Sequence, residues 1–160
     1  MTFDKNMTVL STEKILHHSG VLLWRIVSEF EQAPRWIDGV KRAEPVGGQP
    51  AKVGGVWRVH LQGNDSEQIV NFEITEWVEG ERFGLRPLNM SAITGDIELY
   101  QVVVNLKGLN HQTRVTVQCE YEPRHRLAKI KNLVFLRRRY LQRLEASLAA
   151  LERVAGIQAM

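Results

Sequence analysis

Residues 127–154 read LAKIKNLVFLRRRYLQRLEASLAALERV, an amphipathic stretch at the end of the chain. Aliphatic residues recur there at spacings of three, four and seven: Leu127, Ile130, Val134, Leu141, Leu144, Leu148 and Leu151. Such spacing places them on one side of a helix with 3.6 residues per turn. The apolar stripe is widened by Leu133, Leu136 and Tyr140. A face this broad needs a large apolar surface, so we expect the helix to pack on the strands that precede it.

The region before this helix alternates between apolar and polar residues in several short segments. They predict strands at 57–61, 70–75, 82–86, 100–106 and 114–121, joined by short turns, and therefore antiparallel hairpins. Two earlier strands are expected at 7–16 and 40–46, with helices at 20–30 and 32–37 between them. The fold class is therefore α+β, with about six to seven antiparallel strands, two short helices after the first strand and a long C-terminal helix.

The size and composition are those of one globular domain. The chain has 160 residues, 44% hydrophobic and 24% charged, so we expect a single domain over 1–160, with residues 1–6 disordered. No apolar run reaches the roughly 20 residues of a membrane-spanning helix, and the first residues lack the apolar core of a signal peptide. The single cysteine, Cys119, cannot form an internal disulfide. A cytoplasmic location is the expectation.

Charge is distributed unevenly along the chain. Residues 124–154 hold nine Lys or Arg and two Glu, a formal charge of +7, whereas the whole chain carries +3; the remainder is therefore at −4. Such a basic helix could contact an anionic membrane or an acidic partner, or its charges could simply be solvated. Arg137, Arg138 and Arg139 sweep about 200° of the helix, so one of them must approach the apolar seam. Its head group could reach the rim or point into the interior.

Four short sequence motifs follow one another along the chain. They are Leu23–Phe30 followed by Ala33–Ile37, the glycine-rich segment 47–55, the hairpin segment Ile74–Phe83, and Gln112–Thr116. In this order they resemble the START-like superfamily, which includes the major birch-pollen allergen and the polyketide cyclase/dehydrase-type proteins. The sequence departs from the family pattern at Glu29, where an aspartate is usual, and at Glu79-Gly80, which replaces a proline turn.

The resemblance implies a helix-grip fold. In such a fold a curved antiparallel sheet wraps around the C-terminal helix and leaves an apolar cavity between them. Members of this superfamily bind lipids, polyketides, quinones or other hydrophobic molecules. A hydrophobic small molecule is therefore the expected partner.

Familiar catalytic and cofactor motifs are missing from the sequence. The five histidines include no pair at i, i+4, and there is no HExxH, CxxC, G-x-S-x-G, G-x-G-x-x-G or P-loop lysine. Cys119 falls on the apolar side of its predicted strand and is expected to be a buried structural thiol. We therefore expect no metal site, no cofactor and no nucleic-acid partner.

The predicted strands and the helix define a set of side chains that would line the interior. On the sheet they are Trp57, Val59, Phe72, Ile74, Phe83, Leu85, Tyr100, Val102, Val117, Cys119 and Tyr121. On the helix they are Leu133, Leu136, Arg137 and Tyr140, with Trp36 near an opening. The same residues could instead form a solid core. Glu76 shares strand parity with Phe72 and Ile74, which makes it the only candidate acid or base.

Three functions fit these features, and the first is the leading hypothesis. The chain could be a non-catalytic binder or carrier of a hydrophobic molecule, because catalytic motifs are missing. It could instead be a polyketide cyclase or dehydratase that uses Glu76, Tyr100 or Arg137. A third possibility is a module that docks to a membrane or partner through its basic helix. The sequence leaves the ligand and the oligomeric state open.

Overall fold

The computed structural model describes residues 7–47, 51–62, 66–88, 97–123 and 125–160, with the side chains of 128, 133 and 134 left out. The expectation that residues 1–6 are disordered therefore lies outside the described residues. Part of the predicted turn between strands 57–61 and 70–75 and part of the glycine-rich segment also lie outside them.

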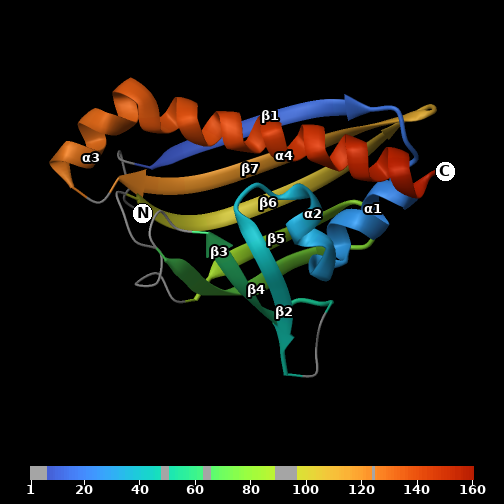
Figure 1. Ribbon diagram of the computed structural model, residues 1–160, viewed down its shortest axis with the longest axis horizontal. Coiled ribbons are helices and arrows are strands. Elements are labelled where there is room, and N and C mark those ends of the chain that lie inside the picture. Colours follow the sequence, from blue (N-terminus) through green and yellow to red (C-terminus); the bar gives the residue numbers. More distant parts are fainter. Residues whose placement is uncertain (1–6, 48–50, 63–65, 89–96, 124) are drawn as a thin grey trace.

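Seven strands form one antiparallel sheet, in the order β1-β7-β6-β5-β4-β3-β2 (Figure 1). Their bounds are β1 Thr8–Leu16, β2 Val40–Val46, β3 Val56–Gln62, β4 Glu67–Val78, β5 Arg82–Pro87, β6 Ile97–Leu109 and β7 Gln112–Pro123. From β2 to β7 every strand pairs with the next along the chain, as short hairpin connections require. The first strand closes the other side of the sheet by pairing with β7.

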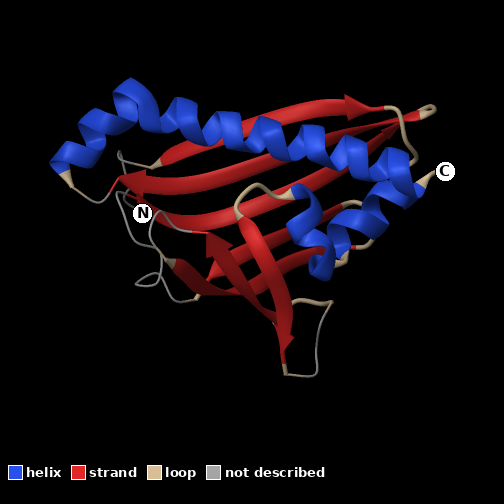
Figure 2. Cartoon of the chain, in the orientation of Figure 1, coloured by secondary structure: helices blue, strands red, loops and turns tan. Residues whose placement is uncertain are grey.

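The helices lie on one face of this curved sheet (Figure 2). Between β1 and β2 come α1 (Gly20–Ser28), the 3-10 turn η1 (Phe30–Gln32) and α2 (Ala33–Trp36). The terminal helix is continuous but has three parts, α3 (Arg126–Lys131), the π-helical segment η3 (Asn132–Leu136) and α4 (Arg137–Gln158). It runs along β1 and β7 and reaches α1 and α2 at its C-terminal end (Figure 1). The helix-grip architecture is thus confirmed. None of the helices in the described ranges is long and apolar enough to cross a membrane.

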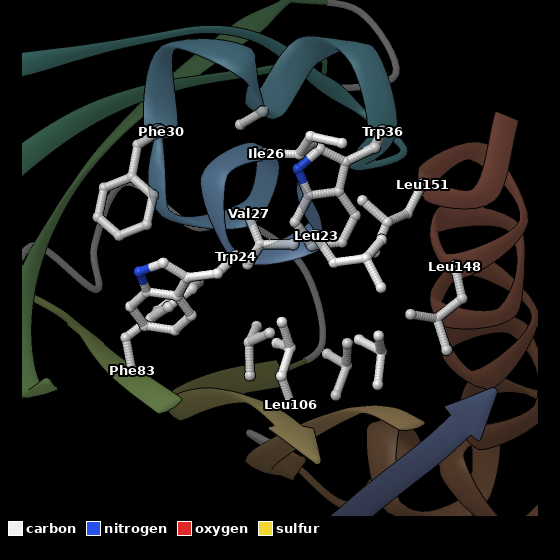
Figure 3. Packing of buried hydrophobic residues seen from close by; sticks show 14 of the residues in the cluster. Leu23, Trp24, Ile26, Val27, Phe30, Trp36, Phe83, Leu106, Leu148 and Leu151 are labelled. Atoms are coloured by element: carbon white, nitrogen blue, oxygen red, sulfur yellow. The ribbon is translucent and has the colours of Figure 1, made fainter. Parts of the chain in front are cut away.

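The core fills one end of the space between sheet and helix. Leu23, Trp24 and Val27 of α1 are buried against Phe83 and Leu106 of the sheet, while Leu148 and Leu151 of α4 close the side (Figure 3). An aromatic group continues the core: Trp24 and Trp77 meet edge to face at 5.3 Å, and Trp77 stacks on Phe83 at 5.9 Å. Glu79 accepts hydrogen bonds from both indole Nε1 groups, at 2.9 and 2.8 Å. The interior at this end of the molecule is therefore well packed.

Three irregularities interrupt the strand pairing, and each adds one residue to one strand. Lys41 is the extra residue in β2, Thr75 in β4 and Tyr100 in β6. A bulge bends a sheet and reverses the side-chain parity beyond it, because side chains alternate with a period of two. In β4 the consequence is that Trp77 pairs with Phe83 and faces the core, whereas Glu76 pairs with Gly84 and faces outward.

The predicted contact between sheet and terminal helix holds from η3 onward but not for the stripe residues of α3. Leu148 and Leu151 are buried, but Leu127 and Ile130 of the expected stripe are 57% and 60% exposed. The prediction was wrong at the N-terminal end because α3 extends beyond the strands, so that no sheet lies beneath those residues (Figure 1). Periodicity identifies an apolar face, but it does not specify what covers that face.

Candidate functional site

A pocket of about 330 Å³ lies between the sheet and the first half of α4, away from the packed core. Its wall combines strand residues, the loop after α2 and one face of α4. The lining residues are Leu10, Ile37, Asp38, Gly39, Leu61, Gln62, Gln68, Phe72, Ile97, Leu99, Cys119, Tyr121, Tyr140, Arg143, Leu144 and Ser147. Most of the wall is apolar, as in sites for small organic molecules.

Four of the predicted interior residues line this pocket: Phe72, Cys119, Tyr121 and Tyr140. Most of the others fill the core instead, since a sheet face can be apolar along its length and still enclose a void at one end only. The buried ones in the core are Trp36, Trp57, Ile74, Phe83 and Val117, and the partly buried ones packed on it are Val59, Leu85 and Val102. Leu136 is buried in η3, outside this core cluster. Trp36 is buried in the core and also borders a separate surface hollow of about 270 Å³ between α2 and α4, but it does not line the pocket. The side chain of Leu133 lies outside the described part of the structure.

Two polar candidates do not enter the pocket. Tyr100 is the extra residue of its bulge, and its hydroxyl donates to Glu122 at 2.7 Å on the outer side of the sheet. Leu99 pairs with Tyr121 and takes the inward place. Arg137 is exposed at the start of α4 and does not contribute to the pocket wall.

Glu76 also lies outside the pocket, contrary to its predicted position. The bulge at Thr75 turns it to the outer face, where its Oε1 is 2.7 Å from Nη2 of Arg82. Both side chains are partly open to solvent. A surface carboxylate with an arginine partner cannot reach a molecule inside the grip, so the only predicted acid or base is removed from the site.

The inner end of the pocket contains two tyrosines in contact. Tyr121 and Tyr140 meet edge to face with ring centroids 5.5 Å apart. The Tyr121 hydroxyl donates to Oδ1 of Asn132, whose Nδ2 donates to Oγ1 of Thr8 at 3.1 Å. Burial, aided by the neighbouring Tyr140, raises the pKa of Tyr121 above its ordinary value. The phenol is therefore a neutral group that anchors the wall to the helix.

The opening of the pocket is polar. Four lining residues are exposed and mark it: Asp38, Gly39, Gln62 and Arg143. The Asp38 backbone N–H donates to Oγ of Ser147 at 3.0 Å, and the Ser147 hydroxyl donates to the carbonyl of Arg143 at 3.0 Å. Nε of Arg143 lies 4.0 Å from Oδ2 of Asp38. These contacts fasten the loop after α2 to α4 and leave one carboxylate and one guanidinium at the entrance.

Cys119 is the only thiol of the chain and forms part of the pocket wall. Burial raises its pKa from 9.0 to about 11. The thiol is therefore protonated at neutral pH and is a poor nucleophile. Within the described ranges, no group of three or more His, Cys, Asp or Glu is arranged to hold a metal ion.

Several wall residues were not among the predicted set, and only some carried a signal in the sequence. Leu61 shares the parity of Trp57 and Val59, and Leu144 belongs to the helical stripe, so the pattern could have identified both. The inward position of Leu99 could not be predicted, because the alternation of apolar and polar residues does not reveal the bulge that turns it inward. The entrance loop Ile37–Gly39 also follows no periodicity, and its position depends on packing between α2 and α4.

Comparisons with known proteins agree with this architecture. The profile of the family described as polyketide cyclase/dehydrase and lipid transport matches residues 7–156. No curated protein shows significant sequence similarity to the chain. The ginseng major latex-like protein 151 from Panax ginseng is 15% identical, with a TM-score of 0.70 over 94% of this chain and 98% of that one.

Two bacterial structures are also similar. The Zhui aromatase/cyclase from Streptomyces sp. R1128 is 11% identical, with a TM-score of 0.75 over 96% of each chain. A protein from Thermus thermophilus is 15% identical, with a TM-score of 0.75 over 96% of this chain and 100% of that one. At these identities the likeness concerns the fold.

Proposed function

The chain belongs to the polyketide cyclase/dehydrase and lipid transport family, and we propose that it binds a hydrophobic small molecule without transforming it. The observation that carries this proposal is the apolar pocket of about 330 Å³ between sheet and α4. Its volume is near the lower limit of ordinary ligand sites, roughly 300 to 1,000 Å³, which favours one compact molecule.

The arrangement of the wall indicates what kind of molecule fits. Leu10, Phe72, Leu99 and Leu144 provide apolar surface inside, while charged groups are confined to the opening. Burying an apolar ligand surface contributes about 25 cal/mol per Å², whereas burying an unpaired polar group opposes binding. The expected ligand is therefore amphiphilic, with its apolar body inside and its polar group near Arg143 and Gln62.

Filling the pocket tests this proposal. Cys119→Phe places a ring in the wall, and it should lower the affinity for 8-anilinonaphthalene-1-sulfonate at least about tenfold, or about 1.4 kcal/mol. The dye, whose fluorescence reports an apolar site, is titrated into each variant, and fatty acids or aromatic phenols are then used to displace it.

Val9→Phe is the matched control. Val9 is exposed on the outer face of β1, so the same ring there should leave the affinity unchanged. If the dye bound Cys119→Phe as tightly as the unaltered protein, binding in this pocket would be contradicted. The absence of any retained ligand in native mass spectrometry, with a full panel of lipids and phenols, would count equally against it.

A further inference from the structure

The N-terminal third of the terminal helix leaves large apolar side chains in solvent. Leu127, Ile130 and Phe135 are 57%, 60% and 52% exposed. Leu127 and Ile130 are three residues apart in α3, so their side chains are neighbours on the helix surface. In Figure 1, α3 projects beyond the strands. A group of exposed apolar side chains on one element marks a contact surface.

The charged side chains of this segment and of the first two turns of α4 are all basic. Residues 125–144 contain seven Lys or Arg and no Asp or Glu. Arg126, Lys129, Arg138 and Arg139 are exposed. In the part of the chain that the structure describes, no ion pair holds any of these four. Their charges are therefore free to meet an anionic partner.

The opposite side of the segment is held against the body of the protein. Leu136 is buried, and Asn132 is hydrogen-bonded to Tyr121 of β7 and Thr8 of β1. One face of the helix is thus occupied, and only the outer face can meet a partner. A flat surface suits this geometry, whereas a groove that enclosed the helix would have to displace these contacts.

We propose that α3, η3 and the first turn of α4 dock on the surface of an anionic lipid bilayer. A bilayer offers both requirements at once, since its head groups carry negative charge and its acyl region takes apolar side chains. Nucleic acid would satisfy the basic residues, but its phosphates give Leu127, Ile130 and Phe135 no apolar environment. The docking face is therefore Leu127, Ile130 and Phe135, surrounded by Arg126, Lys129, Arg138 and Arg139.

The docking face and the pocket meet at η3. Asn132 in this segment holds Tyr121, which lines the pocket, and Tyr140 follows one turn into α4. A bilayer under α3 and η3 would thus lie next to the inner end of the pocket. Docking goes beyond ligand binding itself, because it concerns the surface on which the protein would act.

Sedimentation with vesicles tests the proposal on the full chain. Vesicles of phosphatidylcholine are compared with vesicles that also contain phosphatidylglycerol, over a range of salt concentrations. We expect binding only to the anionic vesicles, falling as salt rises, because basic residues are attracted within a Debye length of the surface.

Charge reversal on the docking face should weaken this binding. Each basic residue near such a surface contributes roughly fivefold, so Arg138→Glu with Arg139→Glu should lower the partition coefficient more than about twentyfold. The control, Arg25→Glu with Arg35→Glu, changes the net charge equally at exposed positions on α1 and α2. Equal losses in the two double variants would overturn the proposed face, because net charge alone would then explain binding.

The apolar contribution needs its own variant. Phe135→Ser should lower binding about tenfold, whereas Val21→Ser, at another exposed apolar position, should not. In Phe135→Trp the added indole should shift its emission to the blue on anionic vesicles. An unshifted emission, an unaffected Phe135→Ser, or tight binding to duplex DNA in place of vesicles would each overturn the proposal. Dye binding in the pocket should be unchanged in these variants, so this outcome is separate from that of the proposed function.

Discussion

At the scale of single residues, the reactivity of Cys119 can be used to test whether the pocket wall is buried. The pKa of this thiol is raised to about 11 by burial. At pH 8 about one thiol in a thousand is then ionised, against about one in ten at the ordinary value. Because a more basic thiolate is also a stronger nucleophile, disulfide exchange should be slower by about tenfold, which is less than the full loss of ionisation. The rate of reaction with a chromogenic aromatic disulfide, followed from pH 7 to 11, measures this directly.

The unfolded protein provides the comparison, because in urea Cys119 loses its burial and should react at the rate of an ordinary thiol. A ligand in the pocket should slow the reaction of the folded protein further. A folded-state rate profile with its midpoint near pH 9 would show instead that Cys119 is open to water.

Glu76 provides a second prediction at this scale. Because its carboxylate is paired with Arg82 on the outer face, Glu76→Gln should leave dye affinity and any turnover unchanged. The free energy of unfolding should fall by no more than about 1 kcal/mol, since exposed ion pairs contribute little. Dye titration and urea unfolding measure both quantities.

Glu73→Gln is the matched variant, because Glu73 also pairs with an arginine, Arg86, at 3.1 Å on the neighbouring strand. The two variants should behave alike. Loss of ligand binding or turnover in Glu76→Gln alone would show that this residue faces the interior, and it would support the cyclase hypothesis.

At the scale of elements, the bulge in β4 should tolerate no side chain opposite it. A Cβ on Gly84 would lie 3.0 Å from Oγ1 of Thr75, the extra residue of the bulge. We expect Gly84→Ala to lower the free energy of unfolding by about 1 to 3 kcal/mol, as overpacked sites do. Urea unfolding measures the change.

Gly108 in β6 is the control, because a Cβ there meets nothing within 4 Å. Gly108→Ala should be neutral or slightly stabilising, since alanine has fewer unfolded conformations than glycine. Adding Thr75→Ala to Gly84→Ala should recover part of the loss, because it removes the atom that the new Cβ meets. Equal effects of the two glycine substitutions would contradict the close approach.

The terminal helix, also at this scale, has a buried C-terminal part and an exposed N-terminal part. Leu148, Leu151 and Ala155 form its buried C-terminal face, while Leu127 and Ile130 continue the same periodicity into solvent. The π-helical segment η3 lies between the two regions, and such segments occur often at functional sites. One periodic stripe can therefore serve as core at one end and as a contact surface at the other.

At the scale of the whole molecule, the fold separates a packed end from an open end. Helices α1 and α2, the C-terminal half of α4 and the aromatic side chains of β4 and β5 fill one end. The pocket, the polar opening and the basic docking face lie toward the other. Stability and the proposed ligand binding thus depend on different parts of one sheet, so filling the pocket should not unfold the protein.

Much of this fold could be read from the amino-acid order. Alternation with period two in 57–61 and 114–121, the helical spacing of 141–151 and four short motifs led to the helix-grip fold, because local periodicity reflects which side of an element is apolar. The same patterns led to Phe72, Cys119, Tyr121 and Tyr140 in the pocket wall.

Three features depended on the folded molecule: the outward position of Glu76, the inward position of Leu99 and the exposure of Leu127. A bulge adds one residue and reverses the parity without changing the local pattern. Likewise, an apolar stripe shows that a face can be covered, but whether sheet, ligand or lipid covers it depends on where the neighbouring strands end.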